Sequence, residues 1–177
     1  MYPFLRMAIE GRLARKLSPL DLGQDHVSTH RCWPWDIDPW MELNNGRTLT
    51  LYDLGRIPLG ARSGLISVLK ENQWGLTVAG STIRYRRRIL PFEKFTMRSR
   101  GVGWDDRFFY IEQSMWKKNG ECASHAVIRS AFTSKSGIVP PPEVVKKLNF
   151  PDVSPELPAF VQNWIDSETT RPWPPMS

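Results

Sequence analysis

Four consecutive segments with a two-residue hydrophobic alternation constrain the fold of this chain most. They span residues 76–89, 94–104, 107–118 and 121–135. Each has the length and the content of β-branched and aromatic residues that are typical of a strand. The short polar sequences WDD and KNGE separate neighbouring segments and indicate tight turns between antiparallel strands. The second half of the chain therefore predicts an antiparallel sheet.

The first half predicts one strand and two helical pieces. Residues 26–35 alternate like a strand, and from about Asn45 the apolar residues follow a helical period. Pro58 is expected to end or kink this helix, and a second helical piece covers 59–70. One helix can be covered by one curved antiparallel sheet, so the fold class is α+β.

The length of 177 residues suits one domain, with a core at about 26–147. A basic segment, 1–20, precedes this core. We expect it to pack on its own domain as a helix, and contact with a membrane surface is the alternative. The extension 149–177 contains many prolines together with Trp164 and Trp173, and we expect it to wrap over the domain or to become loose at its end.

The formal charge of +6 indicates a polyanionic partner. The densest basic cluster is RYRRR (84–88), which could contact phosphates or form a solvated strand edge. The other basic residues are dispersed, which argues against nucleic acid. The three histidines, at positions 26, 30 and 125, show no metal-ligand spacing, so we predict no metal. Two cysteines are too few for a disulfide scaffold and fit a cytoplasmic location.

The segment DIDPWMELNNG (36–46) places three carboxylates and two asparagines just ahead of the predicted helix. Asp and Asn in such a position commonly cap a helix. The N–H groups near Asn45 and Gly46 lack intrahelical partners, so they could also polarise a substrate carbonyl. Asp38 could attack that carbonyl or take a proton from water. Asp36 would point the opposite way in an extended chain and is interpreted as structural.

These residues also resemble a known family. The pattern D-x-D-x-x-x-[H]-x-N-N, followed by a helix that ends in acid-x-x-R, is similar to the hotdog-fold acyl-CoA thioesterases related to 4-hydroxybenzoyl-CoA thioesterase. The thioesterase-like branch is the most similar. The matching residues are Asp36, Asp38, Asn44, Asn45, Asp53 and Arg56. TIRYRRRILPFEKFTMRSRGVGWDDRFFYIEQ and ASHAVIRSAFTSKSGIVPP resemble the same branch. Two positions depart from the pattern: Glu42 replaces the usual His, and Thr48 replaces a frequent aromatic residue.

The resemblance implies a hotdog fold, in which a curved antiparallel sheet wraps around a central helix and two subunits join edge to edge. It implies active sites at the subunit interface and hydrolysis of an acyl-CoA thioester, with coenzyme A as part of the substrate and no separate cofactor. We expect a homodimer or a dimer of dimers, joined along 76–89. Because Glu42 replaces the usual His, the alternative function is a non-catalytic protein that binds acyl-CoA or an acyl carrier. A dehydratase or hydratase would need a histidine at the helix entry, where this chain has none.

With the resemblance, the predicted catalytic residues are Asp38, Asn45, Gly46 and Asp53. Asp53 could instead form only an ion pair with Arg56, three residues along the helix. The predicted substrate-binding residues are Trp40, Arg86, Arg87 and Arg88. If the strand extends through the basic cluster, Arg84, Arg86 and Arg88 share one face, and Tyr85 and Arg87 the other.

Overall fold

The structure is a computed structural model that describes residues 2–148, 151, 153–172 and 174–175. The helices are α1 (Phe4–Ala14), the short 3-10 helix η1 (Pro34–Asp36), α2 (Asn45–Arg62), α3 (Leu65–Glu71), α4 (Pro141–Lys146) and α5 (Ala159–Thr169). The strands are β1 (His26–Arg31), β2 (Gly75–Tyr85), β3 (Lys94–Trp104), β4 (Phe109–Lys117), β5 (Cys122–Ser134) and β6 (Gly137–Val139). Among these elements no helix has both the length and the apolar character to cross a bilayer.

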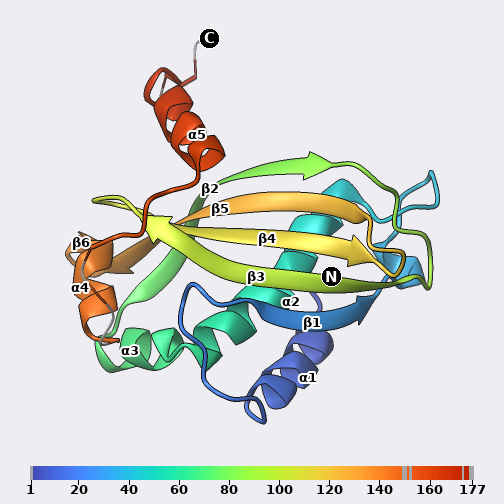
Figure 1. Cartoon of the computed structure of the whole chain (residues 1–177), viewed down its shortest axis with the longest axis horizontal. Helices are drawn as coiled ribbons and strands as arrows, with labels where there is room; N and C mark the ends of the chain where they lie inside the picture. The colour runs from blue at the N-terminus through green and yellow to red at the C-terminus, as the bar shows by residue number, and fades with distance from the viewer. Residues whose placement is uncertain (1, 149–150, 152, 173, 176–177) are drawn as a thin grey trace.

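Within the described residues the strands form one antiparallel sheet that curves around α2 (Figure 1). The strand order is β1-β3-β4-β5-β2, and the short β6 pairs with β5. The predicted α+β hotdog fold is therefore confirmed. Strands β1 and β2 are the outer strands of this order, and most side chains of β2 are exposed.

The core lies between α2 and the concave face of the sheet. Leu51 and Leu54 of α2 are fully buried in the same hydrophobic cluster as Met97 of β3. Gly55 permits this close packing, because a Cβ there would lie 2.4 Å from Ser99 Oγ and 2.7 Å from Met97 Sδ. The helical period of the sequence thus reflects one face of α2 pressed against the sheet.

Pro58 was expected to end or kink the first helix. The end at Pro58 is wrong, because α2 continues past it to Arg62, and the kink stays a prediction. An internal proline removes one helix hydrogen bond and crowds the carbonyl four residues before it, and the burial of Pro58 offsets part of that loss. The break comes instead at Gly64, whose φ of +79° favours glycine. The predicted helical piece 59–70 is therefore divided between α2 and α3.

Two predicted strands end four residues earlier than the sequence indicates, and two others lose one or two residues at their ends. Strand β1 ends at Arg31, because η1 begins at Pro34. Strand β2 ends at Tyr85, because the N–H groups of Arg86 and Arg87 both donate to the Ala123 carbonyl and interrupt the regular ladder. The prediction that Arg84, Arg86 and Arg88 share one strand face is consequently wrong.

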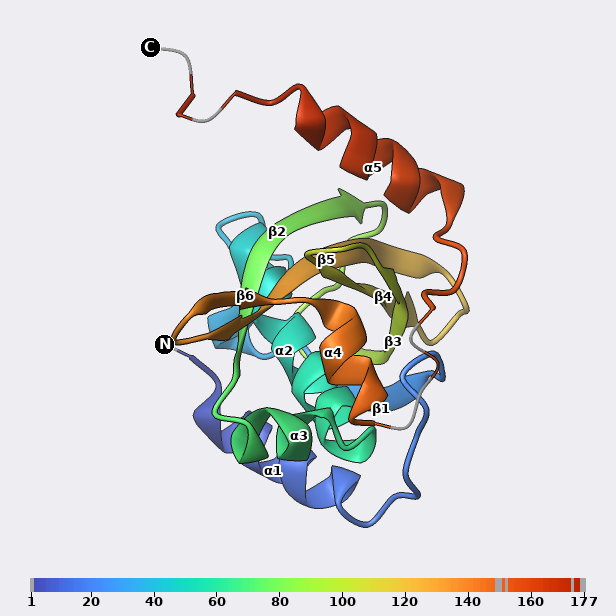
Figure 2. The same ribbon diagram turned by 90° about the vertical axis from the view of Figure 1, so that its left-hand side faces the viewer.

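The C-terminal extension contains a helix that the alternation in the sequence did not reveal. Helix α5 lies on the outer side of the sheet, opposite the face that holds α2 (Figure 2). Its Val161 packs with Tyr110 and Val127, and Trp164 meets Tyr110 edge-on at a ring distance of 6.4 Å. Trp173, which the sequence analysis grouped with this segment, lies outside the described residues.

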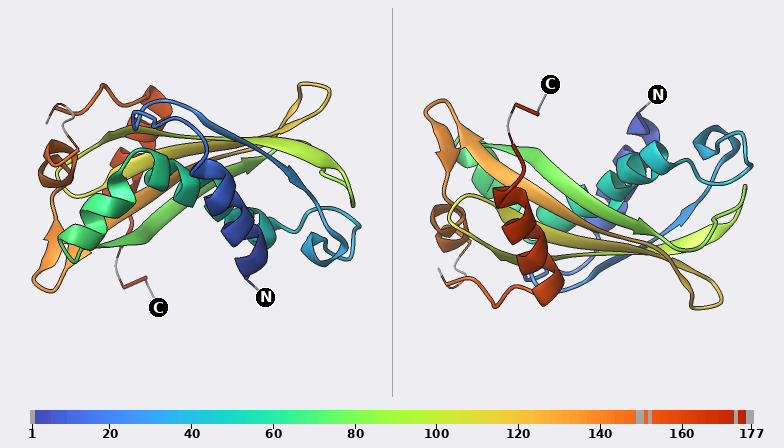
Figure 3. Two further views of the ribbon diagram at one scale, coloured as in Figure 1. Left: turned by 90° about the horizontal axis from the view of Figure 1, so that it is seen from below. Right: turned by 90° about the horizontal axis from the view of Figure 1, so that it is seen from above.

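Helix α1 packs against α2 and beside β1, as Figure 3 shows from two sides. Its Glu10 lies 3.6 Å from the buried ring of His30, and burial lowers the pKa of His30 to about 4. Both cysteines are free, and Cys32 is buried, which raises the pKa of its thiol to about 11. The thiol of Cys32 therefore stays protonated and unreactive at neutral pH.

Candidate functional site

The segment between β1 and α2 forms a narrow hairpin-like loop with Asp38 near its tip. The Asp38 N–H donates to the Glu42 carbonyl at 2.9 Å, and the Asn44 N–H donates to the Asp36 carbonyl at 3.0 Å. Met41, in the turn itself, has a left-handed φ of 60°, which is uncommon for a residue with a Cβ. The backbone of the loop therefore fixes Asp38 at the entrance to α2.

One oxygen of the Asp38 carboxylate is held by the loop. Asp38 Oδ1 accepts the Trp40 N–H at 2.9 Å and, more weakly, the Glu42 N–H at 3.4 Å. Asp38 Oδ2 has no hydrogen-bond partner among the residues that the structure describes. The side chain is half-buried, so the second oxygen can contact a substrate or a water molecule. Trp40 is largely exposed beside it.

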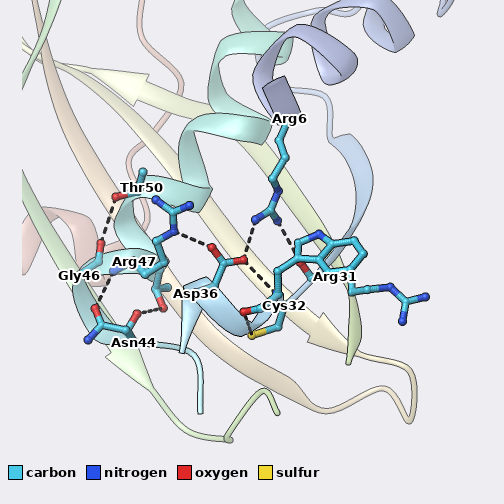
Figure 4. Close-up of polar contacts among 10 residues, drawn as sticks. Arg6, Arg31, Cys32, Asp36, Asn44, Gly46, Arg47 and Thr50 are labelled. Carbon is cyan, nitrogen blue, oxygen red and sulfur yellow. Dashed lines mark hydrogen bonds and ion pairs between the residues drawn. The ribbon is translucent and has the colours of Figure 1, made fainter. Parts of the chain in front are cut away.

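Asp36 has the structural role that its position predicted. Its side chain is fully buried, and each carboxylate oxygen binds one guanidinium at 2.7 Å, from Arg6 of α1 and from Arg47 of α2 (Figure 4). The Trp33 N–H also donates to Asp36 Oδ2 at 3.1 Å, and Arg6 donates to the Arg31 carbonyl at 3.0 Å. Asp36 thus connects α1, the end of β1 and the first turn of α2.

The N-terminus of α2 has both a cap and free donors. The side chain of Asn44 accepts the Arg47 N–H at 3.0 Å, so Asn44 is the capping residue. The N–H groups of Asn45 and Gly46 have no acceptor among the described residues. These two N–H groups lie at the positive end of the helix dipole and can receive a carbonyl oxygen that gains negative charge.

A small polar pocket of about 170 Å³ adjoins this helix end. Asn45 lines it together with Glu42, Tyr85 and the three arginines at 86–88. The Tyr85 hydroxyl donates to the Asn45 carbonyl at 3.0 Å and ties the end of β2 to the start of α2. The pocket is therefore rich in positive charge, which suits phosphate groups.

The three arginines of this pocket have different roles within the chain. Arg88 forms an ion pair with Glu42 and donates to the Trp40 carbonyl at 2.6 Å, so it supports the loop that carries Asp38. Arg87 pairs with Glu121 at 2.7 Å. Arg86 forms no ion pair within the described part of the chain, and its side chain is exposed. Arg86 is thus the arginine most available to a ligand.

Asp53 lies away from this pocket and borders a separate cavity. It forms an ion pair with Arg56, and the Tyr2 hydroxyl donates to it at 2.9 Å. Burial and this carboxylate raise the pKa of Tyr2 to about 12. Arg56 also donates to Gln113 Oε1 at 3.0 Å, and burial lowers its pKa. Each of these contacts uses an oxygen of Asp53 or a donor of Arg56, which favours a structural role for the pair.

The cavity beside Asp53 has a volume of about 390 Å³ and mostly apolar walls. Leu59 of α2, Leu65 of α3 and Ile111 of β4 contribute to its interior. Leu76 and Val78 of the outer strand β2 line its rim. A partner that joined at β2 would therefore border this cavity.

The structure thus separates the predicted site residues into two groups. Asn45 lines one pocket with Arg86, Arg87 and Arg88, while Gly46 and the Asp38 loop adjoin the same helix end. Asp53 lines the apolar cavity instead. The assignments of catalytic and binding roles stay predictions.

Several polar residues of these two regions escaped the sequence analysis. Gln113 is fully buried and donates to the Tyr52 carbonyl at 2.8 Å and to Ser99 Oγ at 2.7 Å. The sequence signal was a glutamine on the inward side of the strand, which it shares with Phe109 and Ile111. A buried polar side chain at such a position needs hydrogen-bond partners. Tyr2 gave no such signal, because only the packing of α1 brings it to Asp53.

No three His, Cys, Asp or Glu side chains among the described residues are grouped closely enough to hold a metal ion. His26 is buried beside Arg62 of α2, and His30 is buried beside Glu10 of α1. His125 pairs with Glu112 at 2.8 Å on another part of the sheet. The histidines are therefore separate from the helix entry.

Comparison with known proteins identifies the family. The sequence profile of the thioesterase-like superfamily matches residues 32–165. The chain belongs to this superfamily. Protein THEM6 of Xenopus laevis is 32% identical over 165 residues, which are 92% of this chain and 78% of that protein.

Solved structures of thioesterases share the superfamily's fold. The probable thioesterase YbaW of Escherichia coli has a TM-score of 0.65 at 15% identity, over 70% of this chain and 95% of that one. Slr0204 of Synechocystis, a 1,4-dihydroxy-2-naphthoyl-CoA thioesterase, has a TM-score of 0.61 at 8% identity, over 72% of this chain and 100% of that one. These identities are low, so the likeness concerns the fold alone.

The two departures from the thioesterase pattern are both accommodated inside the chain. Glu42 forms the ion pair with Arg88. Thr48 is buried, and its hydroxyl donates to the Asn44 carbonyl at 3.1 Å, which closes the first turn of α2.

Proposed function

We propose that this chain hydrolyses the thioester of an acyl-CoA to a free acid and coenzyme A. Membership of the thioesterase-like superfamily supports a thioesterase in general. The observation that carries the specific proposal is the pair of free N–H groups at Asn45 and Gly46, beside the Asp38 carboxylate and a pocket lined by three arginines. This group of residues supplies a base or nucleophile, donors for an oxyanion and a cationic surface.

Each part has a role in the proposed reaction. The thioester carbonyl oxygen accepts hydrogen bonds from Asn45 and Gly46, which stabilise the negative charge that develops on it. Asp38 either attacks the carbonyl carbon or takes a proton from the water that attacks it. If water attacks, the C–S bond then breaks and the oxygen from water ends in the free acid. If Asp38 attacks, loss of the thiolate leaves an anhydride between Asp38 and the acyl group, and water hydrolyses it to the free acid and the Asp38 carboxylate. In both routes the thiolate of coenzyme A takes a proton.

The apolar cavity supports the same proposal from the acyl side. Its walls are apolar, and its rim includes Leu76 and Val78 of β2. Within one chain this cavity is separate from the helix entry, so we place the acyl group at the border between two subunits joined along β2, where the cavity of the partner subunit can receive it. The 1,4-dihydroxy-2-naphthoyl-CoA thioesterase of similar fold makes aryl groups a further class of acyl group to test.

Two rival functions of the same fold remain to be separated from hydrolysis. Glu42 replaces the usual histidine, and its ion pair with Arg88 leaves it engaged, which is compatible with a protein that only binds acyl-CoA. A dehydratase or hydratase is less well supported, because no histidine of the described chain lies at the helix entry. Both rivals would take a similar substrate.

A free-thiol release assay tests the proposal most directly. Purified protein is incubated with a panel of acyl-CoAs of increasing chain length and with aryl-CoAs, and released coenzyme A is measured with a thiol reagent. We expect turnover with at least one class. Absence of turnover on the whole panel, together with measurable acyl-CoA binding, would support the binding protein instead.

Loss of the Arg86 side chain is expected to raise KM for acyl-CoA by roughly tenfold, with kcat nearly unchanged. Arg86 forms no ion pair within the described chain, so its removal leaves the loop intact. A phosphate contact far from the carbonyl stabilises the bound substrate and the transition state alike. Steady-state kinetics of Arg86→Ala measure both constants.

Arg84→Ala is the matched control, because Arg84 is an exposed arginine of the same run that does not line the pocket. Arg88→Ala should raise KM further and also lower kcat, since Arg88 supports the Asp38 loop. An unchanged KM in Arg86→Ala would assign this arginine to solvent.

We also expect a homodimer, or a dimer of dimers, joined along β2. The outer position of β2 and its exposed Leu76 and Val78 motivate this prediction, because an unpaired apolar strand edge favours pairing with another strand. Multi-angle light scattering at micromolar concentration should give at least twice the mass of one chain. A monomer would contradict both the interface and the placement of the acyl group there. A cytoplasmic location likewise stays a prediction.

A further inference from the structure

One face of helix α1 packs against the rest of the domain. Arg6 binds Asp36 at 2.7 Å, and Glu10 lies 3.6 Å from His30. Met7 packs against the core, and Ala14 is buried. These contacts hold α1 beside β1, so the opposite face of the helix has a fixed direction relative to the domain.

The outer face of α1 is strongly apolar and basic. Leu5, Ile9 and Leu13 recur every four residues and leave 76%, 47% and 50% of their surface exposed. This spacing puts them in one stripe along the helix. Arg12, just inside the helix end, and Arg15 and Lys16, just beyond it, are exposed as well. The acidic residue of α1, Glu10, faces inward, so the outer face carries only positive charge.

Aromatic side chains extend this face beyond the helix. Phe4 is 73% exposed and Trp35 is 68% exposed, and both line a shallow groove of about 420 Å³. Trp35 stacks on Trp33 at a ring distance of 5.5 Å, which holds it in place. Exposed tryptophan beside arginine and aliphatic residues is typical of proteins that contact the interfacial layer of a membrane.

We propose that this α1 surface, made of Phe4, Leu5, Ile9, Leu13, Trp35, Arg12, Arg15 and Lys16, docks on a lipid bilayer that contains anionic lipids. The apolar stripe inserts among the acyl chains, while the three basic residues contact the negatively charged headgroups. The helix lies in the plane of the membrane, as amphipathic helices with a basic polar face do.

The charges favour a membrane over a second copy of the chain. In a symmetric pair the same patch would face itself, and because the patch contains no acidic residue, Arg12, Arg15 and Lys16 would find no compensating charge on the other copy. The helix that carries most of this patch also contacts a different outer strand from the one proposed to join the dimer. Helix α1 contacts β1, and β1 and β2 are at opposite ends of the strand order.

Vesicle sedimentation of the full chain tests the proposal. Vesicles of phosphatidylcholine alone are compared with vesicles that also contain phosphatidylserine. We expect binding to the anionic vesicles, weakened by added salt. Leu5→Ser with Ile9→Ser should lower the affinity by tenfold or more, since two apolar contacts are lost. Each lost positive charge accounts for a roughly fivefold loss of affinity. The double variant Arg12→Glu with Lys16→Glu should therefore lower the affinity by more than this.

Matched control variants distinguish binding through the α1 surface from nonspecific adsorption to vesicles. Ile138→Ser with Val153→Ser removes two other exposed apolar residues, and Lys118→Glu with Lys135→Glu reverses two other exposed charges. Both control variants should bind vesicles like the wild type. Circular dichroism confirms that each variant is folded.

Three outcomes would overturn the proposal. The first is wild-type protein that binds neither kind of vesicle. The second is control variants that lose as much binding as the α1 variants. The third is a smaller oligomer for Leu5→Ser with Ile9→Ser in light scattering without any vesicle binding, which would give this face to a second copy. The readout is binding, so failure of the proposed hydrolysis would leave this inference intact.

Discussion

Asp38→Asn should lower kcat for acyl-CoA hydrolysis by about a hundredfold or more, which is the scale on which a positioned base acts. An amide is neither a base nor a nucleophile, whereas its oxygen can still accept the Trp40 and Glu42 N–H groups that hold the loop. The melting temperature should therefore stay within about 2 °C of the wild type, and KM should change little. Steady-state kinetics and thermal unfolding measure the three quantities.

The opposite outcome has an equally clear meaning. The side-chain oxygen of asparagine can hold these loop N–H groups as well as that of aspartate. If Asp38 only stabilises the loop, Asp38→Asn keeps both its activity and its melting temperature. Full activity would therefore remove the catalytic assignment and direct attention to Asp53 or Glu42.

Gly46→Ala is a companion variant for the oxyanion donors. A Cβ at Gly46 would meet only Asn44 Oδ1, at 3.4 Å, and alanine forms helices better than glycine by about 1 kcal/mol. The variant should consequently be as stable as the wild type or slightly more stable. A methyl group beside the free N–H groups would nevertheless crowd the thioester carbonyl, so a lower kcat without a lower melting temperature supports this site.

Local signals in the sequence predicted the elements that frame the site. Helix α2 begins at Asn45, as its periodicity indicated, because Asn44 caps the first turn. Strand β3 has the predicted bounds, because its apolar residues alternate regularly against α2. These features depend on residues close in sequence, so a single chain reveals them.

Contacts between distant segments account for what the sequence analysis missed. The burial of Pro58 keeps α2 continuous, and the shared Ala123 carbonyl ends β2 before the arginines. The contact of Tyr2 with Asp53 depends on the packing of α1. In each case the deciding partner is remote in sequence, and no local pattern encodes it.

The residues of the candidate site likewise differ in whether the sequence alone predicts their positions. Asp38, Asn45 and Gly46 lie at one helix entry because they are neighbours in the sequence. Asp53 was grouped with them by the family pattern, yet the structure places it at a separate cavity with Arg56 and Gln113. The spacing of Asp53 from Asn45 along the helix was known from the sequence, but the side chains of α3, β2 and β4 that line the second cavity were not.

Asp36→Asn is the second change with a large expected effect, and it should act on stability. Both oxygens of Asp36 accept charged donors, from Arg6 and Arg47, and Oδ2 also accepts the Trp33 N–H. In asparagine the negative charge between the two guanidinium groups is lost, and one oxygen becomes an NH₂ group that faces a donor. Breaking a buried ion pair from one side costs about 3 kcal/mol or more. The lower end applies, because 17% and 15% of the two arginine side chains are exposed.

That loss should lower the melting temperature by roughly 6–12 °C for a chain of this size. Hydrogen exchange should become faster in α1 and in the first turn of α2, because Asp36 connects these two elements. Well below the melting temperature kcat should remain within a few-fold of the wild type, since Asp36 is buried and does not contact the proposed substrate. Thermal unfolding, hydrogen exchange and kinetics on one preparation provide all three readouts.

The same substitution at two positions, two residues apart, thus has opposite expected results. Asp38→Asn should lower turnover and spare stability, whereas Asp36→Asn should lower stability and spare turnover. If Asp36→Asn instead abolishes turnover with an unchanged melting temperature, the catalytic carboxylate is Asp36, and the buried ion pairs do not describe the working state. If both variants lose only stability, the loop is structural throughout, and a binding protein becomes the better description of this chain.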